Sequence, residues 1–233
     1  MTRPSVNAKN PWKICLPIVE PTTERAVRAA AQAQGLFDLV ELRVDYIKNP
    51  GLEILFQARE RPSIVTNRRK EEGGRYQGDE TRRRRILREA VDLGFEFVDL
   101  ELGSGRSAAE EVMGSQTKTR LILSHHDLKK TPPLGELRNL CRRMVRRGAD
   151  VIKIVTLARS WEDNLKVLSL IPYALEQKQK IVALCMGDRG KMSRVFAPLM
   201  GASWTYAPLM REHASAPGQL TARELKEIWR SLR

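Results

Sequence analysis

The stretch LGELRNLCRRMVRRGADVIKIVTL, residues 134–157, contains the unit that decides the fold. In its first half, apolar residues recur at spacings of three and four, which predicts one apolar stripe along a helix: Leu134, Leu137, Leu140, Cys141, Met144 and Val145. Gly148 is expected to end this helix, because glycine readily adopts the left-handed conformation of a helix C-terminus. The β-branched run Val151–Leu157 then predicts a buried strand.

The same alternation of helix and strand runs through the chain. Amphipathic segments separate nearly all of eight β-prone runs, which are Ile14–Val19, Leu39–Val44, Ser63–Thr66, Phe95–Leu100, Leu121–Ser124, Val151–Leu157, Ile181–Leu184 and Trp204–Tyr206. Such strands pair in parallel through right-handed crossovers. We therefore expect an α/β fold, a single (β/α)8 TIM barrel over residues 1–233, with 1–12 as a flexible N-terminal segment. An open doubly wound sheet is the alternative.

Other signals concern the helices. Gly94, like Gly148, follows a helical run just before a strand. A second apolar helix stripe is predicted from Trp161, Leu165, Leu168 and Leu175. Capping-box patterns predict the starts of three helices at Ser107-x-x-Glu110, Ser160-x-x-Asp163 and Thr221-x-x-Glu224.

The composition is that of a soluble globular protein, with 42% apolar and 30% charged residues. No apolar run approaches the roughly 18 residues of a membrane span, and the N-terminus lacks the apolar region of a secretory signal. The three cysteines have no CxxC spacing and leave an odd one over. We expect a cytoplasmic protein.

The net charge of +13, from 41 basic and 28 acidic residues, allows two interpretations. A basic surface binds nucleic acid, whereas a basic cavity attracts a small anion. The densest runs, Arg82–Arg85 and 142–147, lie in predicted helices and lack the interleaved aromatic residues that stack on single strands. We interpret them mainly as solvated helix surface, and nucleic acid is not an expected partner.

Polar residues gather where the predicted strands end, which in a barrel is where the chemistry takes place. Strand alternation places Glu41, Arg43 and Asp45 on one face, and Asp99 and Glu101 on one face of another strand. Further polar residues follow the third and fifth strands or interrupt the sixth, namely Arg68, Ser124, His125, His126, Asp127 and Lys153. We expect them to converge on one mouth of the barrel.

Lys153 lies inside the apolar run 151–157. A lysine there is costly to bury as a cation, and a neutral amine in a barrel is a nucleophile that forms a Schiff base with a carbonyl. The alternative is a structural lysine that reaches a neighbouring carboxylate.

Two histidines are adjacent at the end of the fifth strand, and only one can face inward. His126 shares the face of Ser124, whereas His125 is expected to point toward the helices. Glu101, one strand over, is the expected orienting partner for His126 as a general base. A metal site is disfavoured, because no third histidine lies nearby in the sequence.

The segment Ala214-Ser-Ala-Pro-Gly-Gln219 is small and has turn chemistry. It is interpreted either as a mobile lid over a bound substrate or as an ordinary exposed turn.

Taken together, these pieces resemble type I 3-dehydroquinate dehydratase, in family order over about residues 13–230. The matching stretches are Glu41-Leu-Arg-Val-Asp45, Thr66-Asn-Arg68 with Glu72-Gly-Gly74, Asp99-Leu-Glu101, Ser124-His-His-Asp127 with Thr131-Pro132, Gly148–Ile154, Met186-Gly187 with Gly190-Lys-Met-Ser-Arg194, and Ala214–Gln219. The resemblance implies a TIM-barrel lyase of the shikimate pathway that needs neither a metal nor an organic cofactor, and a homodimer.

It also implies roles for individual residues. Lys153 forms an imine with the C3 ketone of 3-dehydroquinate. His126 takes the C2 proton and then protonates the departing C1 hydroxyl, while Glu101 orients His126. Arg194 pairs with the substrate carboxylate. The ring hydroxyls and the lid are assigned to Glu41, Arg43, Arg68, Ser215 and Gln219.

The chain departs from the family pattern at His125, where an aromatic residue is frequent, and at Asn67, where phenylalanine is common. Two other interpretations are weighed. A class I aldolase also needs a strand lysine, but it requires a phosphate-binding glycine turn near the last strands. A catalytically silent basic barrel that binds nucleic acid predicts retention on heparin with a steep salt dependence.

Overall fold

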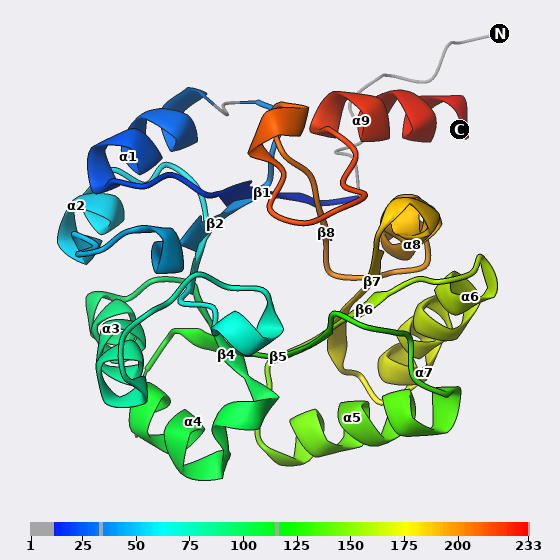
Figure 1. The fold of residues 1–233 in the computed structure, drawn as a ribbon, viewed down its shortest axis with the longest axis horizontal. Coiled ribbons are helices and arrows are strands. Elements are labelled where there is room, and N and C mark those ends of the chain that lie inside the picture. The colour runs from blue at the N-terminus through cyan, green and yellow to red at the C-terminus, as the bar shows by residue number, and fades with distance from the viewer. Residues whose placement is uncertain (1–11, 33–34, 115–116, 233) are drawn as a thin grey trace, which may run out of the picture.

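Eight parallel strands form the centre of the molecule, and helices surround them (Figure 1). The computed structural model describes residues 12–32, 35–114 and 117–232. The strands are β1 Ile14–Ile18, β2 Leu39–Arg43, β3 Ser63–Thr66, β4 Phe97–Glu101, β5 Arg120–Asp127, β6 Val151–Leu157, β7 Lys180–Met186 and β8 Thr205–Tyr206. All eight predicted strands are present, with small differences at their ends. The flexible segment predicted for residues 1–12 falls almost entirely outside the described residues.

The order of the strands confirms the barrel. Each of β1 to β7 pairs with its neighbour in the sequence, and β8 pairs in parallel with β1. Ser203, just before β8, donates from its backbone N–H to the carbonyl of Ile181 in β7 at 2.8 Å. This contact spans the seam between β7 and β8, so the sheet curves into a nearly closed barrel rather than an open one.

The helices follow the strands in turn. They are α1 Thr23–Gln32, α2 Leu52–Gln57, α3 Glu80–Leu93, α4 Arg106–Met113, α5 Leu134–Arg146, α6 Glu162–Leu168, α7 Leu170–Glu176, α8 Lys191–Leu199 and α9 Ala222–Ser231. Short 3-10 helices lie in several connections after strands, namely η1 Val44–Tyr46, η2 Lys70–Glu72, η3 Leu102–Ser104, η4 Asp188–Gly190 and η5 Arg211–His213. None of the helices among the described residues is long and apolar enough to cross a membrane.

The helix ends predicted from the sequence are confirmed at some positions and wrong at others. Gly94 and Gly148 both adopt left-handed backbone angles, as predicted. Thr221 and Glu224 form the predicted capping box at the start of α9. The box predicted at Ser107 is wrong, because the residue that caps α4 is Gly105, two residues earlier, and Ser107 lies inside the helix. At Ser160, only the Asp163 side chain reaches back to the backbone N–H, and α6 begins at Glu162.

The second predicted stripe is wrong as a buried surface. The chain divides there into α6 and α7, and of the four residues only Leu168 is buried. Trp161 is 59% exposed, Leu165 56% and Leu175 44%. The break between the two helices gives the stripe no common face against the barrel, so this part of the molecule presents apolar side chains to the outside.

The barrel interior is unusually polar toward the ends of its strands. Most strand residues are buried apolar side chains. The buried polar set nevertheless includes Glu41, Arg43, Arg68, Asp99, Glu101, Ser124 and Lys153. Buried charges are costly unless they are paired, so this cluster marks the place where the molecule departs from an ordinary core.

Candidate active site

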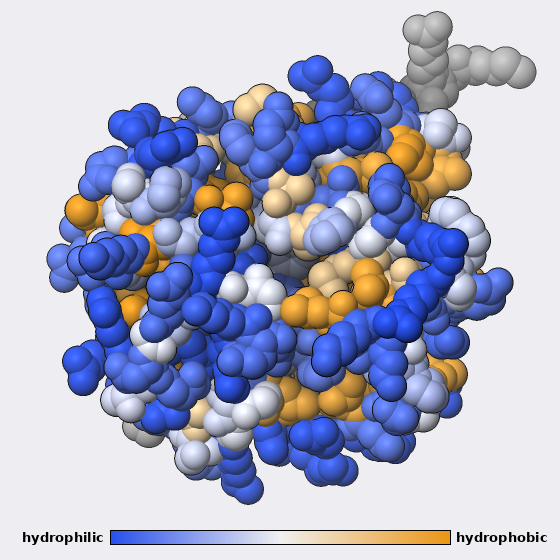
Figure 2. Space-filling view, in the orientation of Figure 1, coloured by the Kyte–Doolittle hydropathy of each residue, from blue (hydrophilic) through white to orange (hydrophobic). Residues whose placement is uncertain are grey.

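A cavity of about 140 Å³ opens among the carboxyl ends of the strands. The space-filling view shows a hollow at the centre of this face, with hydrophilic residues around much of it (Figure 2). Its lining consists of Glu41, Arg43, Arg68, Glu72, Gly73, His126, Leu128, Lys153, Val155, Leu184, Met186, Arg194, Tyr206, Ser215, Ala216, Pro217 and Gln219. Every site residue predicted from the sequence lines it except Glu101.

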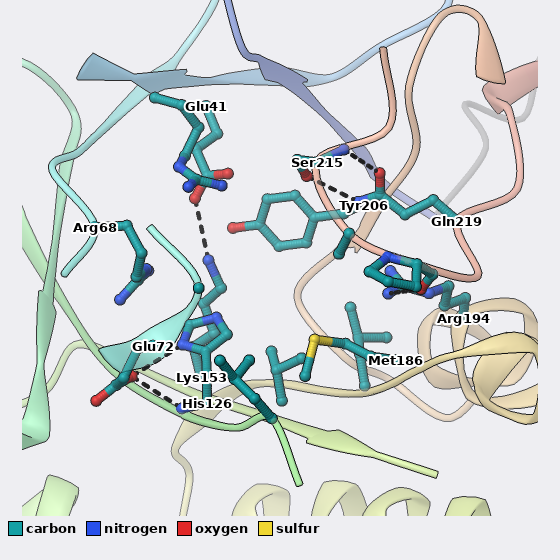
Figure 3. A pocket seen from close by; sticks show the side chains of 17 residues that line it. Glu41, Arg68, Glu72, His126, Lys153, Met186, Arg194, Tyr206, Ser215 and Gln219 are labelled. Carbon is teal, nitrogen blue, oxygen red and sulfur yellow. Dashed lines mark hydrogen bonds and ion pairs between the residues drawn. The ribbon is translucent and has the colours of Figure 1, made fainter. Parts of the chain in front are cut away.

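Lys153 reaches the cavity from β6 and is only 4% exposed. Its Nζ lies 3.1 Å from Oε1 of Glu41 (Figure 3). It also lies 2.9 Å from Oδ2 of Asp99. The ring of Tyr206 lies beneath the amine, with its centroid 4.5 Å from Nζ. A buried lysine held between two carboxylates is fixed in place, with its amine toward the cavity.

Asp99 is a permanent anion in this arrangement. Burial by itself raises the pKa of a carboxyl group, but Arg68 and Lys153 hold the pKa of Asp99 well below its usual range. Ser124 adds a hydrogen bond from its hydroxyl to Oδ1 of Asp99 at 2.6 Å. Asp99 therefore stays charged beside the amine.

His126, the general base expected from the sequence, has Glu72 as its partner in the structure. The Glu72 carboxylate accepts from the backbone N–H of His126 at 2.9 Å and lies 3.1 Å from Nδ1 of the ring (Figure 3). Burial, with the nearby cations Arg68 and Lys153, lowers the pKa of His126 well below its usual value. The ring is therefore neutral at pH 7, and its Nε2 is left to act as a base.

The predicted contact between Glu101 and His126 is wrong. Oε1 of Glu101 accepts from Nη1 of Arg68 and from the backbone N–H of Arg69, both at 3.0 Å. Its Oε2 accepts from Nη1 of Arg83 at 2.7 Å. In the strand register Glu101 lies opposite Ser124, two residues before His126. Its oxygens accept hydrogen bonds from the two arginines instead.

Glu72 was missed because it lies outside the strands. It ends η2, the short turn that follows β3, and burial raises its pKa to about 7, against the opposing effect of Arg68. The signal in the sequence was the pair of glycines after it. A Cβ on Gly74 would lie 1.9 Å from the carbonyl oxygen of Arg68, so only glycine permits this tight turn.

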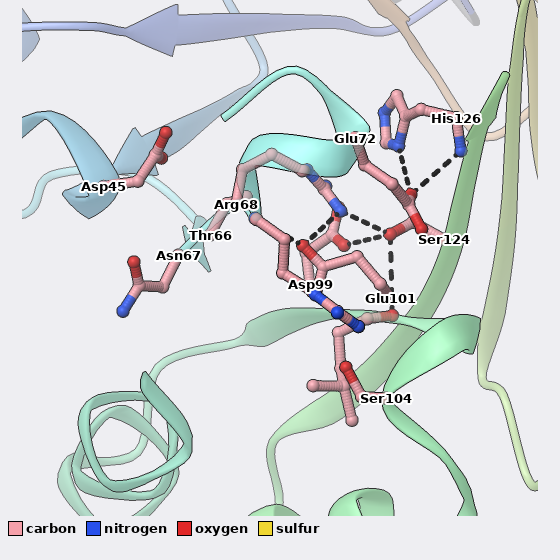
Figure 4. Close-up of polar contacts among 12 residues, drawn as sticks. Asp45, Thr66, Asn67, Arg68, Glu72, Asp99, Glu101, Ser104, Ser124 and His126 are labelled. Carbon is pink, nitrogen blue, oxygen red and sulfur yellow. Dashed lines mark hydrogen bonds and ion pairs between the residues drawn. The ribbon is translucent and has the colours of Figure 1, made fainter. Parts of the chain in front are cut away.

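Arg68 contacts side chains of two neighbouring strands, β4 and β5. Its Nη1 donates to the Ser124 hydroxyl at 2.7 Å as well as to Glu101, and its Nη2 lies 2.8 Å from Oδ2 of Asp99 (Figure 4). Arg43 is held separately, in a bidentate pair with Asp45 at 2.8 Å. Both guanidinium groups are thus oriented before any substrate binds.

Arg194 is buried without an anionic partner. It projects from α8, is 2% exposed, and forms no ion pair with any side chain in the described part of the chain. Its Nη2 donates to the carbonyl of Pro217 in a long hydrogen bond of 3.5 Å. Burial lowers its pKa to about 10, so it is still a cation at neutral pH. A buried, unpaired guanidinium is a site for a carboxylate.

The segment 214–219 closes one side of the cavity. Ser215 donates from its backbone N–H to Oε1 of Gln219 at 2.9 Å, and Gln219 Nε2 donates to the Ser215 hydroxyl at 3.1 Å. A Cβ on Gly218 would lie 2.1 Å from the Gly187 carbonyl oxygen, so this loop packs tightly against the end of β7. Both polar side chains face the cavity together (Figure 3).

His125 and Asn67, the two residues that depart from the family pattern, lie outside the cavity lining. His125 is half-buried, and burial, with the nearby Arg143, lowers its pKa against the opposing effect of Asp127. Arg143 belongs to α5, so His125 faces the helical layer, as strand alternation predicts. Asn67 is fully buried. Within residues 12–32, 35–114 and 117–232, no three His, Cys, Asp or Glu side chains are arranged to hold a metal ion.

Comparisons with known proteins show which family the chain resembles. A family model described as type I 3-dehydroquinase matches residues 14–233. The 3-dehydroquinate dehydratase of Methanocaldococcus jannaschii is 34% identical over 221 residues, which are 93% of this chain and 97% of that protein. The one from Methanococcus maripaludis strain C7 is 36% identical and covers 92% of this chain and 97% of its own.

A solved structure supports the same conclusion. The crystal structure of type I 3-dehydroquinate dehydratase from Clostridium difficile has a TM-score of 0.85 and 26% sequence identity, over 94% of this chain and 91% of that one. With the family model and these relatives in agreement across nearly its whole length, the chain belongs to the type I 3-dehydroquinase family.

Proposed function

We propose that this enzyme dehydrates 3-dehydroquinate to 3-dehydroshikimate through an imine on Lys153, as a step of the shikimate pathway. The observation that carries the proposal is the meeting of three groups in one cavity: a buried amine, a neutral histidine and an unpaired guanidinium. They match what the reaction needs, which is a nucleophile for the ketone, a base for the adjacent proton and a cation for the carboxylate.

Imine formation is the task of Lys153. Its amine attacks the C3 ketone, and loss of water gives an imine whose protonated form withdraws electrons from C2 more strongly than the ketone does. Glu41 and Asp99 hold Nζ from two sides at 3.1 and 2.9 Å. This fixed position reduces the entropy that must be lost before attack.

Proton transfer is assigned to His126. With Nδ1 bound to the Glu72 carboxylate, Nε2 takes the C2 proton, and the resulting cation then protonates the C1 hydroxyl, which departs as water. A second water hydrolyses the imine and frees Lys153. The carboxylate of Glu72 fixes the tautomer and stabilises the imidazolium, which is the role first assigned to Glu101.

Substrate binding is assigned to the remaining lining residues. The unpaired Arg194 receives the substrate carboxylate in a charge-assisted contact. Glu41, Arg43, Arg68, Ser215 and Gln219 are assigned to the ring hydroxyls, and the last two close the loop over the ligand. The four cations of the lining outnumber its two carboxylates, which favours an anionic substrate.

We also propose a homodimer in the cytoplasm. The exposed apolar side chains Trp161, Leu165 and Leu175 support self-association, and three buried free cysteines fit a reducing compartment. Light scattering is expected to give a molar mass of twice the chain mass of 26.5 kDa. The mass of a single chain, measured at high protein concentration, would contradict the dimer.

The activity itself is tested by adding 3-dehydroquinate to the purified protein and following the conjugated product by its ultraviolet absorbance. Turnover is expected for the native enzyme and no measurable turnover for Lys153→Ala, because the imine cannot form. Lys191→Ala, a half-exposed lysine on α8, is the matched control with native activity. Native-like rates in Lys153→Ala would remove the Schiff-base mechanism.

The pH dependence tests the role of Glu72. Because burial raises its pKa to about 7, the carboxylate is present above that pH and lost below it. We expect kcat/KM to fall as the pH decreases through about 7. In Glu72→Gln, kcat/KM is expected to lose this pH dependence. Its rate is expected to be lower on the order of tenfold or more, since the base loses its orienting partner.

Glu71→Gln serves as the control for this experiment, because the Glu71 side chain, next to Glu72 in the sequence, is 72% exposed. A Glu72→Gln enzyme that keeps the native rate and the native fall of kcat/KM below about pH 7 would show that His126 does not depend on this carboxylate.

Binding of the carboxylate is tested with Arg194→Ala. Loss of a buried charged hydrogen bond costs about 1.5–3 kcal/mol, so KM is expected to rise roughly tenfold to a hundredfold with a smaller change in kcat. Arg223→Ala on α9, which is exposed, is the control. Steady-state kinetics with an unchanged KM would exclude this residue as the carboxylate ligand.

A further inference from the structure

One of the four consecutive arginines of α3 is not on the surface. Arg83 is 0% exposed, whereas Arg82 and Arg85 are exposed. Arg83 shares the inner face of the helix with Leu87 and Ala90, which are four and seven residues further along and equally buried. The run of arginines that suggests a solvated surface therefore places one guanidinium behind the active site.

All five N–H donors of the Arg83 guanidinium have acceptors. Glu80 accepts in bidentate geometry, from Nε at 2.9 Å and from Nη2 at 2.7 Å. Nη2 also donates to the Ser104 hydroxyl at 2.8 Å, and Nη1 to the Asn67 carbonyl at 2.9 Å. The fifth donor reaches Oε2 of Glu101 at 2.7 Å. Of the two carboxylates, Glu80 lies on the same helix and Glu101 in the barrel.

From Glu101 one chain of contacts runs to the amine. Glu101 binds Nη1 of Arg68 at 3.0 Å, Arg68 pairs with Asp99 at 2.8 Å, and Asp99 lies 2.9 Å from Nζ of Lys153. Opposite charges alternate along the whole path, and every side chain in it is nearly or fully buried. Figure 4 shows Glu101, Arg68, Asp99 and Ser124 gathered around one centre.

A second chain runs from the same carboxylate to the base. Glu101 accepts the backbone N–H of Arg69 at 3.0 Å. The carbonyl of Arg69 in turn accepts the backbone N–H of Glu72 at 3.2 Å and that of Gly74 at 2.8 Å. Glu101 therefore also anchors the turn that presents Glu72 to His126.

We propose that Arg83 is a positioning residue for the reaction, which holds Glu101 as a buried carboxylate so that Glu101 fixes both Arg68 and the Glu72 turn. This inference rests on the proposed function. Without the Arg83 cation, the remaining cation beside Glu101 is Arg68, which also pairs with Asp99. The buried charge then either draws Arg68 toward itself or takes up a proton, and both outcomes disturb the groups around Lys153 and His126.

The alternative is that Arg83 only attaches α3 to the barrel. The two roles differ in what they change. An attachment affects the fraction of folded protein and its Tm, whereas a positioning residue affects the rate of each folded active site.

The test compares Arg83→Gln, which removes the cation, with Arg83→Lys, which keeps one for Glu101. Arg85→Gln, the same change at an exposed position of the same helix, is the control. Folded sites are counted by borohydride reduction in the presence of 3-dehydroquinate, and kcat is expressed per trapped site. We expect Arg83→Gln to lose about tenfold in kcat per site, Arg83→Lys to recover most of it, and Arg85→Gln to match the native enzyme.

Coupling to Glu101 gives an independent measurement. If Arg83 acts through Glu101, the loss caused by Arg83→Gln nearly disappears in a Glu101→Gln background, because the charge that it balances is gone. This double variant also carries the test if Arg83→Gln alone does not fold. An additive further loss in the double variant contradicts the proposal.

The proposal is also overturned if kcat per site is native in Arg83→Gln while only Tm falls, or if the lysine and glutamine variants are equally impaired. Failure of the proposed function is distinguishable from these results, because it appears as absent turnover and absent trapping in the native enzyme itself.

Discussion

The burial of the Lys153 amine inside the barrel is the constraint on which the site depends. A lysine that is 4% exposed must have charged or polar partners, and strands β2 and β4 supply them as Glu41 and Asp99. Those carboxylates in turn need cations and donors, which Arg68, Ser124 and Thr66 provide. Removing one member of such a buried ion pair typically costs about 3–5 kcal/mol, so the groups hold one another in place.

Three ionisable groups around the cavity have different surroundings, and the proposed mechanism depends on this difference. Lys153 has two carboxylates, Arg194 has none, and His126 is kept neutral by burial and by nearby cations. The unpaired cation is available for an acid substrate, and the neutral ring is available for a proton. The two carboxylates of the lining, Glu41 and Glu72, contact the amine and the histidine ring respectively.

Much of this could be predicted from the sequence, because periodicity reports directly on strands and helices. Strand alternation correctly separated His126 from His125, and parallel strands explain why residues far apart in the sequence meet at one mouth. The partner of His126 could not be predicted in this way, since Glu72 comes from a turn after β3 and reaches past β4 to a residue of β5. Glu101 lies on the adjacent strand, but its oxygens are taken by Arg68 and Arg83. Which of several nearby partners a buried carboxylate selects depends on three-dimensional packing that no spacing rule encodes.

The most direct test of the Schiff-base account is the intact mass of the protein after borohydride reduction with 3-dehydroquinate present, followed by peptide mapping. The account predicts one covalent adduct per chain, on the peptide that holds Lys153, and no adduct when the substrate is omitted. A folded protein that turns over the substrate without forming an adduct, or that forms it on another lysine, would contradict the assignment of Lys153 as the nucleophile.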